Sequence, residues 1–307
     1  MRQPYQWAAE LEITPEAAAR LIAEQFPQLA TVKCELLGVG WDNVALLVNG
    51  QFVFRFPRRK MGADLLPTEL RLLPAIAPRL PLPISAPIFE GKPSENFPWP
   101  FAGYRVIPGK TACRMHLGNT ERHALAPALG RFLRALHDIR PDLASDHGAG
   151  FDAMRRLDIP YRSAQTIQRL AYLSQHHLFD LVQDLLAIVR TVPTNYSPRQ
   201  DVLVHGDLYS RHLIIDDAGQ LVGVIDWGDM HLGDPATDLM VGWILFPPNA
   251  RPAFFDAYGK VDSTVWQIAR FRALNHTVCT IPYAHQTRDD ELLAACLLGL
   301  KYLVSEW

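Results

Sequence analysis

Two aspartates stand where the chain could bring their carboxylates together. Asp207 lies in the polar segment His205-Gly206-Asp207-Leu208, and Asp226 follows 19 positions later, at the end of an apolar run. Between them Leu213 to Ile225 forms two short apolar runs joined by Asp216-Asp217-Ala218-Gly219, the pattern of a hairpin that folds back. Converging carboxylates suit phosphoryl transfer, in which one orients the attacking hydroxyl and the other holds a metal ion. They also suit glycoside hydrolysis.

A second group of candidate residues lies nearer the N-terminus. Gly38 and Gly40 precede two apolar runs, Arg55 lies within the second run, and Glu69 follows on a helical pattern. Paired glycines are ordinary turn residues, but their backbone can also cradle a phosphate. A guanidinium binds phosphate bidentately and can pair with a carboxylate such as Glu69. Glycoside hydrolysis leaves all four residues without a role, which favours phosphoryl transfer.

The elements expected to position these residues change character along the chain. A helix begins at Thr14-Pro15-Glu16, with a capping hydroxyl and Pro at its first position. Asn49-Gly50 between Val44 to Val48 and Phe52 to Phe56 predicts a hairpin. Phe101 to Ile107 predicts a last strand. Beyond it the pattern turns helical, with one apolar stripe over residues 125–136 and a further helical stretch from about Ser163 to Val189.

Composition excludes several classes of protein. Among 307 residues, 30 Lys and Arg balance 32 Asp and Glu, which is not the basic balance of a nucleic-acid-binding protein. The longest apolar run, Leu292 to Leu300, is far shorter than the roughly 20 residues that span a bilayer. The four cysteines form no C-x-x-C pair and predict reduced thiols rather than zinc or disulfides. A cytoplasmic protein without nucleic-acid or membrane partners is expected, and its oligomeric state stays open.

The motifs resemble those of the aminoglycoside phosphotransferase family, relatives of the protein kinases. The similarity covers roughly residues 35 to 245. The matching segments follow the family order: Phe54-Arg55-Phe56-Pro57, Glu69, Pro81-Leu82-Pro83, His205-Gly206-Asp207-Leu208, Ile225-Asp226-Trp227, and Gly233-Asp234-Pro235-Ala236 with Asp238-Leu239. H-G-D-L is similar to the kinase catalytic loop, and I-D-W stands where kinases have D-F-G.

The resemblance implies an α+β, protein-kinase-like fold of two lobes. Residues 1–107 would form a small β-rich nucleotide-binding lobe, and residues 108–307 a larger, mainly helical catalytic and substrate-binding lobe. It also implies ATP or GTP and Mg²⁺ as cofactors. Asp207 would be the catalytic residue, and His212 and Asp226 the metal ligands. The nucleotide would be bound by residues of the first lobe: Gly38, Gly40, Arg55, Glu69, Tyr104, Arg105, Val106 and Ile107.

Two positions depart from the family pattern. His212 stands where the second metal ligand should be Asn, and Mg²⁺ prefers oxygen ligands to the imidazole nitrogen that suits zinc or manganese. The macrolide phosphotransferases resemble this chain in having a histidine there. Arg55 stands where kinases have Lys.

The resemblance implies an ATP-dependent transferase for a hydroxyl of a small molecule, such as an aminoglycoside- or macrolide-like antibiotic, and hence antibiotic resistance. A metabolic kinase acting on choline, homoserine, a sugar or a ketosamine is an alternative. A nucleotide-binding pseudokinase, with a metal site degraded at His212, is another. Two groups of residues could line an acceptor pocket. The acids are Asp256, Asp289, Asp290 and Glu291, and the aromatic residues, which the pattern favours, are Trp243, Phe246, Phe254, Phe255, Trp266 and Tyr283.

Overall fold

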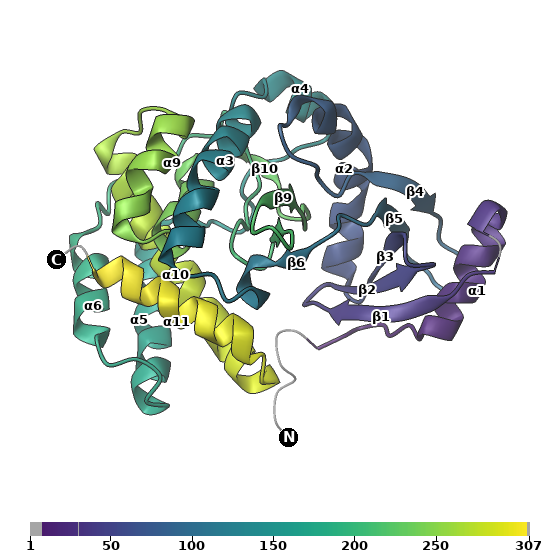
Figure 1. Ribbon diagram of the computed structural model, residues 1–307, viewed down its shortest axis with the longest axis horizontal. Coiled ribbons are helices and arrows are strands. Elements are labelled where there is room, and N and C mark those ends of the chain that lie inside the picture. Colours follow the sequence, from purple (N-terminus) through teal and green to yellow (C-terminus); the bar gives the residue numbers. More distant parts are fainter. Residues whose placement is uncertain (1–7, 30, 306–307) are drawn as a thin grey trace. The chain divides into compact units, whose positions relative to one another are not determined.

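The computed structural model describes residues 8–29 and 31–305, which form two compact units (Figure 1). The N-terminal unit contains the residues up to Pro78 together with Ile84–Ile107, and the C-terminal unit contains Arg79–Pro83 and the residues from Pro108 onward. The chain therefore enters the C-terminal unit briefly before it completes the N-terminal one.

The N-terminal unit is an antiparallel sheet with helices on both faces, and its strand order is β1-β2-β3-β5-β4. The elements are α1 (Pro15–Gln25), η1 (Pro27–Leu29), β1 (Cys34–Val39), β2 (Asn43–Val48), β3 (Phe52–Pro57), α2 (Lys60–Ile76), β4 (Pro87–Gly91) and β5 (Phe101–Arg105), with η2 (Ala77–Arg79) following α2.

Local sequence explains where these elements begin and turn. The Thr14 hydroxyl accepts a hydrogen bond from the Ala17 amide at 3.2 Å, which confirms the predicted start of α1. β2 and β3 are joined through Asn49 and Gly50, whose φ angles of 52° and 66° are those of the tight hairpin turn that Asn-Gly favours. The predicted hairpin is confirmed.

Alternation along β3 assigns its side chains to opposite faces of the sheet. Phe54 and Phe56 are fully buried with α1 residues such as Leu21 and Ile22. The intervening Arg55 points to the other face, where α2 packs over Tyr104 of β5. The pattern of β3 therefore directs Arg55 toward α2.

The C-terminal unit is mainly helical, with short strands that form two small sheets of orders β10-β7 and β6-β8-β9. Its elements are β6 (Lys110–Thr111), η3 (Ala112–Arg114), α3 (Asn119–His137), α4 (Pro141–Asp146), α5 (Ile159–Gln175), α6 (Val182–Thr191), β7 (Val202–Val204), β8 (Leu213–Ile215), β9 (Leu221–Val224), β10 (His231–Gly233), α7 (Ala236–Leu239), α8 (Val241–Ile244), η4 (Pro248–Ala250), α9 (Arg251–Tyr258), α10 (Ser263–Thr287) and α11 (Asp290–Val304).

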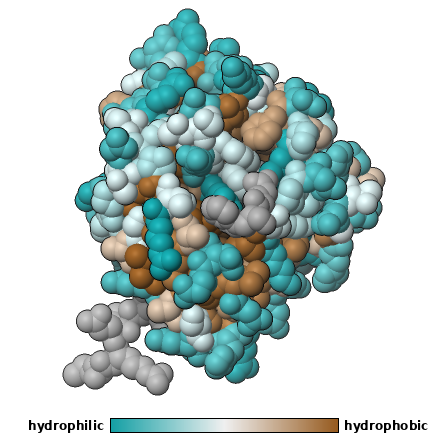
Figure 2. All heavy atoms as spheres, turned by 90° about the vertical axis from the view of Figure 1, so that its left-hand side faces the viewer, coloured by the Kyte–Doolittle hydropathy of each residue, from teal (hydrophilic) through white to brown (hydrophobic). Residues whose placement is uncertain are grey.

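Helix α10 is buried around most of its circumference and contacts α5, α7, α8 and α11. Apolar residues such as Phe271 and Val278 fill the core around it, and Arg272, Asn275 and His276 are buried with them. On the face of this unit shown in Figure 2, hydrophobic side chains gather in the lower middle and hydrophilic side chains surround them. Over the described ranges, no helix is both long and apolar enough to cross a membrane.

Two sequence predictions for this unit can be compared directly with the structure. The apolar stripe over residues 125–136 lies on α3, where Leu125, Leu129 and Phe132 are buried. The single helical stretch predicted from Ser163 to Val189 is wrong, because the chain leaves α5 after Gln175 and begins α6 at Val182. His177 has φ of 51°, a left-handed conformation that a continuous α-helix cannot contain.

Candidate active site

The H-G-D-L segment leaves β7 as a loop that a buried carboxylate fixes. Asp238, on α7, accepts hydrogen bonds from the backbone amides of His205 at 2.7 Å and Gly206 at 2.9 Å. His137 Nε2 lies 3.2 Å from the same carboxylate. Burial alone would raise the pKa of Asp238, but these contacts outweigh it and hold that pKa below its ordinary value. Asp238 thus stays ionised and anchors the loop.

Gly206 is required by the geometry of this loop. Its φ is 88°, and a Cβ there would lie 2.2 Å from the Asp229 carbonyl oxygen. Only glycine combines that backbone conformation with so close an approach. The next residue, Asp207, is therefore presented at a fixed point.

His205 connects the loop to the hairpin that ends at Asp226. Its Nε2 donates to the Ile225 carbonyl at 3.0 Å, and its Nδ1 accepts from the Asp207 amide at 3.3 Å. Burial lowers the pKa of His205, so the ring is neutral, as these two contacts require. The side chain therefore links the loop to the end of the hairpin.

The β8–β9 hairpin places His212 and Asp226 side by side. The Ile225 amide donates to the His212 carbonyl at 2.9 Å, and Asp226 then adopts a left-handed φ of 66°, uncommon for a residue other than glycine. His212 Nε2 lies 3.2 Å from Asp226 Oδ2, and His212 Nδ1 lies 2.7 Å from the Asp207 carbonyl oxygen and 3.8 Å from its Oδ2. His212 therefore lies between the two carboxylates.

This arrangement fits a divalent cation at His212 and Asp226. Burial alone would lower the pKa of His212, but the charges of Asp226 and Asp207 and the hydrogen bonds with them raise it. In the neutral ring, Nδ1 donates to the Asp207 carbonyl and the Nε2 lone pair faces Asp226 Oδ2, where a cation would contact both. At the 3.2 Å separation of Nε2 and Oδ2, one small cation would be within reach of both atoms. Within residues 8–29 and 31–305, no group of three or more His, Cys, Asp or Glu side chains converges on one metal position. Water and phosphate oxygens would supply the remaining ligands, as is usual for Mg²⁺.

A histidine far along the chain also contacts Asp207. His276 Nε2, on α10, donates to Asp207 Oδ1 at 3.0 Å. Burial alone would raise the pKa of the Asp207 carboxyl, but this hydrogen bond and the charges of His212 and Arg272 hold it well below its ordinary value. Burial lowers the pKa of His276, so a neutral ring donates from Nε2. His276 lies outside the motifs from which the site was predicted, although a histidine on a largely buried helix is a detectable signal.

An ion-pair cluster borders the same loop. The guanidinium of Arg156 pairs with Asp152 and with Asp229, which follows Asp226 closely. Burial raises the pKa of Asp229, as do the negative charges of Asp207 and Asp226, while Arg156 opposes the shift. Arg156 is thus compensated by two acids.

In the N-terminal unit, the predicted Arg55–Glu69 pair is present. Arg55 Nη1 lies 3.2 Å from Glu69 Oε2, and the Tyr104 hydroxyl donates to the same oxygen at 3.3 Å. The Arg55 guanidinium also lies over the Tyr104 ring, 5.8 Å from its centroid. Glu69 is almost fully buried by these contacts. The ion pair fixes the direction of Arg55.

The other residues predicted to bind the nucleotide occupy the same unit. Gly38 lies near the end of β1 beside open space, with no atom within 4 Å of an added Cβ, and the Gly40 amide donates to the Asn43 carbonyl at 2.8 Å. Tyr104 is buried within the sheet, and the Arg105 guanidinium lies over the Phe52 ring. The predicted nucleotide contacts also include Val106 and Ile107. The Val106 amide already donates to the Gln51 carbonyl at 3.0 Å, so that amide is not available for a base.

The aromatic residues expected to line an acceptor pocket belong mainly to the core. Trp243, Phe246 and Phe254 are buried, and Trp243 stacks on Trp266 at 4.6 Å. Trp243, Phe246 and Phe254 therefore pack α8, α9 and α10 against one another, whereas Phe255 and Trp266 are half-buried. The acids expected there serve elsewhere too: Asp289 caps α11 and pairs with Arg211, at 3.2 Å in each contact.

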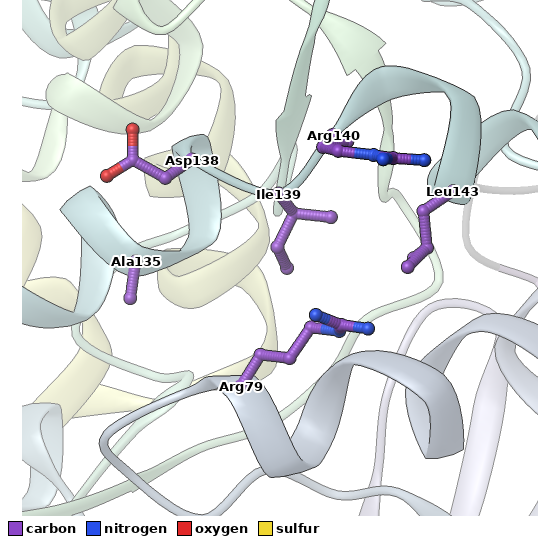
Figure 3. Close-up of a pocket in the computed structure, with 6 residues that line it drawn as sticks. All are labelled: Arg79, Ala135, Asp138, Ile139, Arg140 and Leu143. Atoms are coloured by element: carbon purple, nitrogen blue, oxygen red, sulfur yellow. The ribbon is translucent and has the colours of Figure 1, made fainter.

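A cavity of about 380 Å³ lies elsewhere in the C-terminal unit (Figure 3). Arg79 and Arg140 extend toward it, and its lining includes none of the residues described above. Arg140 is paired with Asp142, and Asp138 with Arg134.

Comparison with known proteins identifies the class. The sequence pattern described as the phosphotransferase enzyme family matches residues 33–274, so the chain belongs to that family. It is 28% identical over 276 residues to viomycin phosphotransferase of Streptomyces vinaceus, covering 83% of this chain and 89% of the relative. It is 30% identical over 110 residues to the uncharacterized protein YcbJ of Bacillus subtilis, but this match spans only 34% of the chain and 36% of the relative.

Solved structures share the fold. The GDP and kanamycin complex of APH(2")-IIia has a TM-score of 0.67 at 24% identity, covering 94% of this chain and 99% of that one. Macrolide 2'-phosphotransferase type I has a TM-score of 0.60 at 19% identity, covering 94% and 97%. The kinase-like aminoglycoside phosphotransferase fold predicted from the sequence is confirmed, with a β-sheet N-terminal region and a helical C-terminal region. By its family the protein is a phosphotransferase enzyme.

Proposed function

We propose that this protein transfers the γ-phosphoryl group of ATP or GTP to a hydroxyl of a small molecule. The observation that supports this most directly is the placement of Asp207 on a loop fixed by Asp238, where its carboxylate lies beside His212, which in turn contacts Asp226. About a quarter of the Asp207 side chain is exposed (28%), so an acceptor can reach it.

In the reaction, the acceptor oxygen forms a bond to the γ-phosphorus while the bond from that phosphorus to the β,γ-bridging oxygen breaks. The hydroxyl proton passes to the Asp207 carboxylate, and the nucleoside diphosphate leaves. Asp226 and His212 would hold Mg²⁺, which supplies charge neutralisation on the phosphates. Arg55, held by Glu69, would bind phosphate oxygens. Gly38 and Gly40, at the end of the first strand and just after it, and the 104–107 segment would contribute to nucleotide binding.

The acceptor class is a separate question. The names of the relatives favour an antibiotic of the viomycin, aminoglycoside or macrolide type. The metabolic alternatives are choline, homoserine, sugars and ketosamines. In the part of the chain that the structure describes, the acids near Asp207 do not form an acid-lined site for a polycation, because Asp229 is paired with Arg156 and Asp226 is paired with His212.

The decisive experiment separates catalysis from nucleotide binding. Asp207→Asn should lower kcat at least 100-fold, because general-base positioning contributes about 10²–10⁴-fold, while the Kd for Mg²⁺-nucleotide stays near that of the wild type. Asp226→Ala should instead weaken Mg²⁺-dependent nucleotide binding. Nucleoside diphosphate release and calorimetry measure the two quantities, with the exposed Asp217→Asn as control.

Turnover by Asp207→Asn within a factor of ten of wild type would disprove the general-base assignment. Nucleotide binding by the wild type without transfer to any acceptor would instead support the pseudokinase alternative.

A further inference from the structure

A buried arginine without a hydrogen-bonding partner lies beside the catalytic aspartate. Arg272 precedes His276 by four residues on α10, so the two side chains share one face of the helix, and His276 contacts Asp207. The Arg272 residue is only 6% exposed, and its Nε is buried without a partner. Across the described part of the chain, its guanidinium donates no hydrogen bond. Burying a cation without hydrogen-bond partners costs free energy, and a bound anionic ligand would offset that cost.

Two further arginines lie on α5, the helix that packs against this face of α10. Asn275 Nδ2 donates to the Thr166 hydroxyl of α5 at 3.0 Å and lies 3.4 Å from Gln165 Oε1. The same Gln165 oxygen accepts from Arg162 Nη1 at 2.7 Å. Arg162 is therefore joined to α10 through one glutamine. Arg169, two turns further along α5, lies on the same helix face as Arg162.

We call Arg162, Arg169 and Arg272 the arginine face. All three act electrostatically on one half-buried thiol, that of Cys279, whose pKa burial raises and the arginines oppose. Cys279 follows Arg272 by seven residues and shares its side of α10. The arginine face thus combines two arginines of α5 with one of α10, on two helices that pack against each other.

Carboxylates compensate the charge of the nearby Arg156, but they do not compensate the charges of the arginine face. Arg156 pairs with Asp152 and Asp229, whereas among the residues the structure describes no ion pair joins a member of the arginine face to a carboxylate. Asp158 acts on Arg162 at longer range, and Asp207 acts on Arg272. Burial and the charges of Arg156 and Arg162 lower the pKa of Arg272 to about 10. A lowered pKa is expected for a buried cation that lies near other cations.

We propose that the arginine face binds an anionic group of the acceptor, a carboxylate or a phosphate, and so places a hydroxyl of that acceptor against Asp207. This inference rests on the proposed function, since it names the acceptor class of the same site. A guanidinium matches carboxylate and phosphate oxygens bidentately, and Arg272 has donors to spare. A polycationic acceptor would place its ammonium groups against three arginines, which costs free energy instead of contributing it.

The first experiment compares acceptors matched in shape and different in charge. One set is galactose, galacturonate and galactosamine, and a second is a nucleoside with its 5′-monophosphate; kanamycin and viomycin serve as polycations. Nucleoside diphosphate release gives kcat/KM for each. The anionic member of at least one set should exceed its neutral counterpart by 10-fold or more, and the polycations should be the poorest acceptors. The two sets distinguish a carboxylate from a phosphate.

The second experiment tests the residues through a ratio, kcat/KM for the anionic acceptor divided by that for its neutral counterpart. Arg272→Gln should lower this ratio about 10- to 100-fold, the range for losing a hydrogen bond to a charged group. Arg272→Lys should retain part of it. Arg169→Gln should also lower this ratio. Because Arg169 is only half-buried, this variant tests the proposal even if Arg272→Gln does not fold. Arg270→Gln is the matched control on the same helix, since Arg270 stacks over Trp243, and should not change the ratio.

Each contrary outcome has its own meaning. Kanamycin or viomycin as the best acceptor overturns the proposal and leaves the phosphotransferase function intact. Equal loss for both members of a pair in Arg272→Gln also overturns it, since Arg272 would then act on the transferring phosphoryl group. Nucleotide binding without turnover of any anionic acceptor counts against the proposal alone. Absence of Mg²⁺-nucleotide binding removes the proposed function itself.

Discussion

At the scale of single residues, the two oxygens of Asp207 have different neighbours. Oδ1 accepts from His276 at 3.0 Å, while Oδ2 lies 3.8 Å from His212. A carboxylate held by one oxygen has its orientation fixed and keeps the other oxygen for a second partner. We infer that His276 is a positioning residue, which acts through Asp207 and does not need to touch the acceptor.

His276→Leu should therefore lower kcat about 10- to 100-fold, the range for losing a hydrogen bond to a charged group, with little change in nucleotide Kd. His276→Gln can still donate and should recover most of the loss. Because the hydrogen bond lowers the pKa of Asp207, its removal should shift the acidic limb of the kcat/KM profile to higher pH. His285→Leu, on the same helix but bonded to Tyr172, is the control. An unshifted limb with equal losses in the Leu and Gln variants would mean that His276 serves only packing.

Candidate site residues that belong to short local motifs could be predicted from the sequence. Those that come from elements far along the chain could not. His205, Asp207 and Asp226 lie in short motifs whose spacing a hairpin explains. His276 and Arg272 reach the loop from α10, more than 60 positions later, because of how α10 packs. Sequence periodicity gives the faces of a helix, but it does not say which neighbour each face meets.

At the scale of elements, the short helix α7 controls the catalytic loop through one side chain. Asp238 accepts hydrogen bonds from two loop amides, and no neutral side chain of similar size can accept both equally well.

The aromatic residues of α8 to α10 show what the sequence pattern alone does not predict. Apolar residues near a site can line a pocket or form a core, and only the observed burial of Trp243 and Phe254 distinguishes the two.

Asp238→Asn should destabilise the protein by about 3 kcal/mol, because it breaks a buried charged network and turns an amide donor toward backbone donors. The folded-state pKa of Asp238 is lowered, so its contribution is present above its ordinary pKa near 4 and is lost as pH falls through the lowered value. The difference in unfolding free energy between wild type and Asp238→Asn should therefore be largest near pH 7 and shrink below about pH 4. Urea unfolding across this range measures it, and Asp256→Asn, at an exposed aspartate, should show no such difference. A difference that does not change with pH would exclude the ionised carboxylate as its source.

At the scale of the whole molecule, the residues proposed for the nucleotide are divided between two units. Arg55 and Glu69 belong to the N-terminal unit, and His212 and Asp226 belong to the C-terminal one. The division follows from the sequence pattern, since a β-rich region precedes a helical one, but the excursion of Arg79–Pro83 into the C-terminal unit has no local signal. The Val224 amide donates to the Pro83 carbonyl at 3.0 Å, which explains why this segment belongs there.

The proposed nucleotide should stabilise the protein in two separable ways. At 100 times its Kd, MgADP or MgGDP should raise the unfolding free energy by about 2.7 kcal/mol, which corresponds to a rise of several degrees in Tm. EDTA should remove the part that depends on the metal. Arg55→Gln should reduce the shift in Tm with or without Mg²⁺, because the variant loses a phosphate contact.

Asp226→Ala and His212→Ala should lose only the Mg²⁺-dependent part of the shift. His212→Asn, which restores an oxygen ligand, should keep that part. If His212→Ala retained the full Mg²⁺-dependent shift, His212 would not be a metal ligand, and the nucleotide's metal would depend on Asp226 alone.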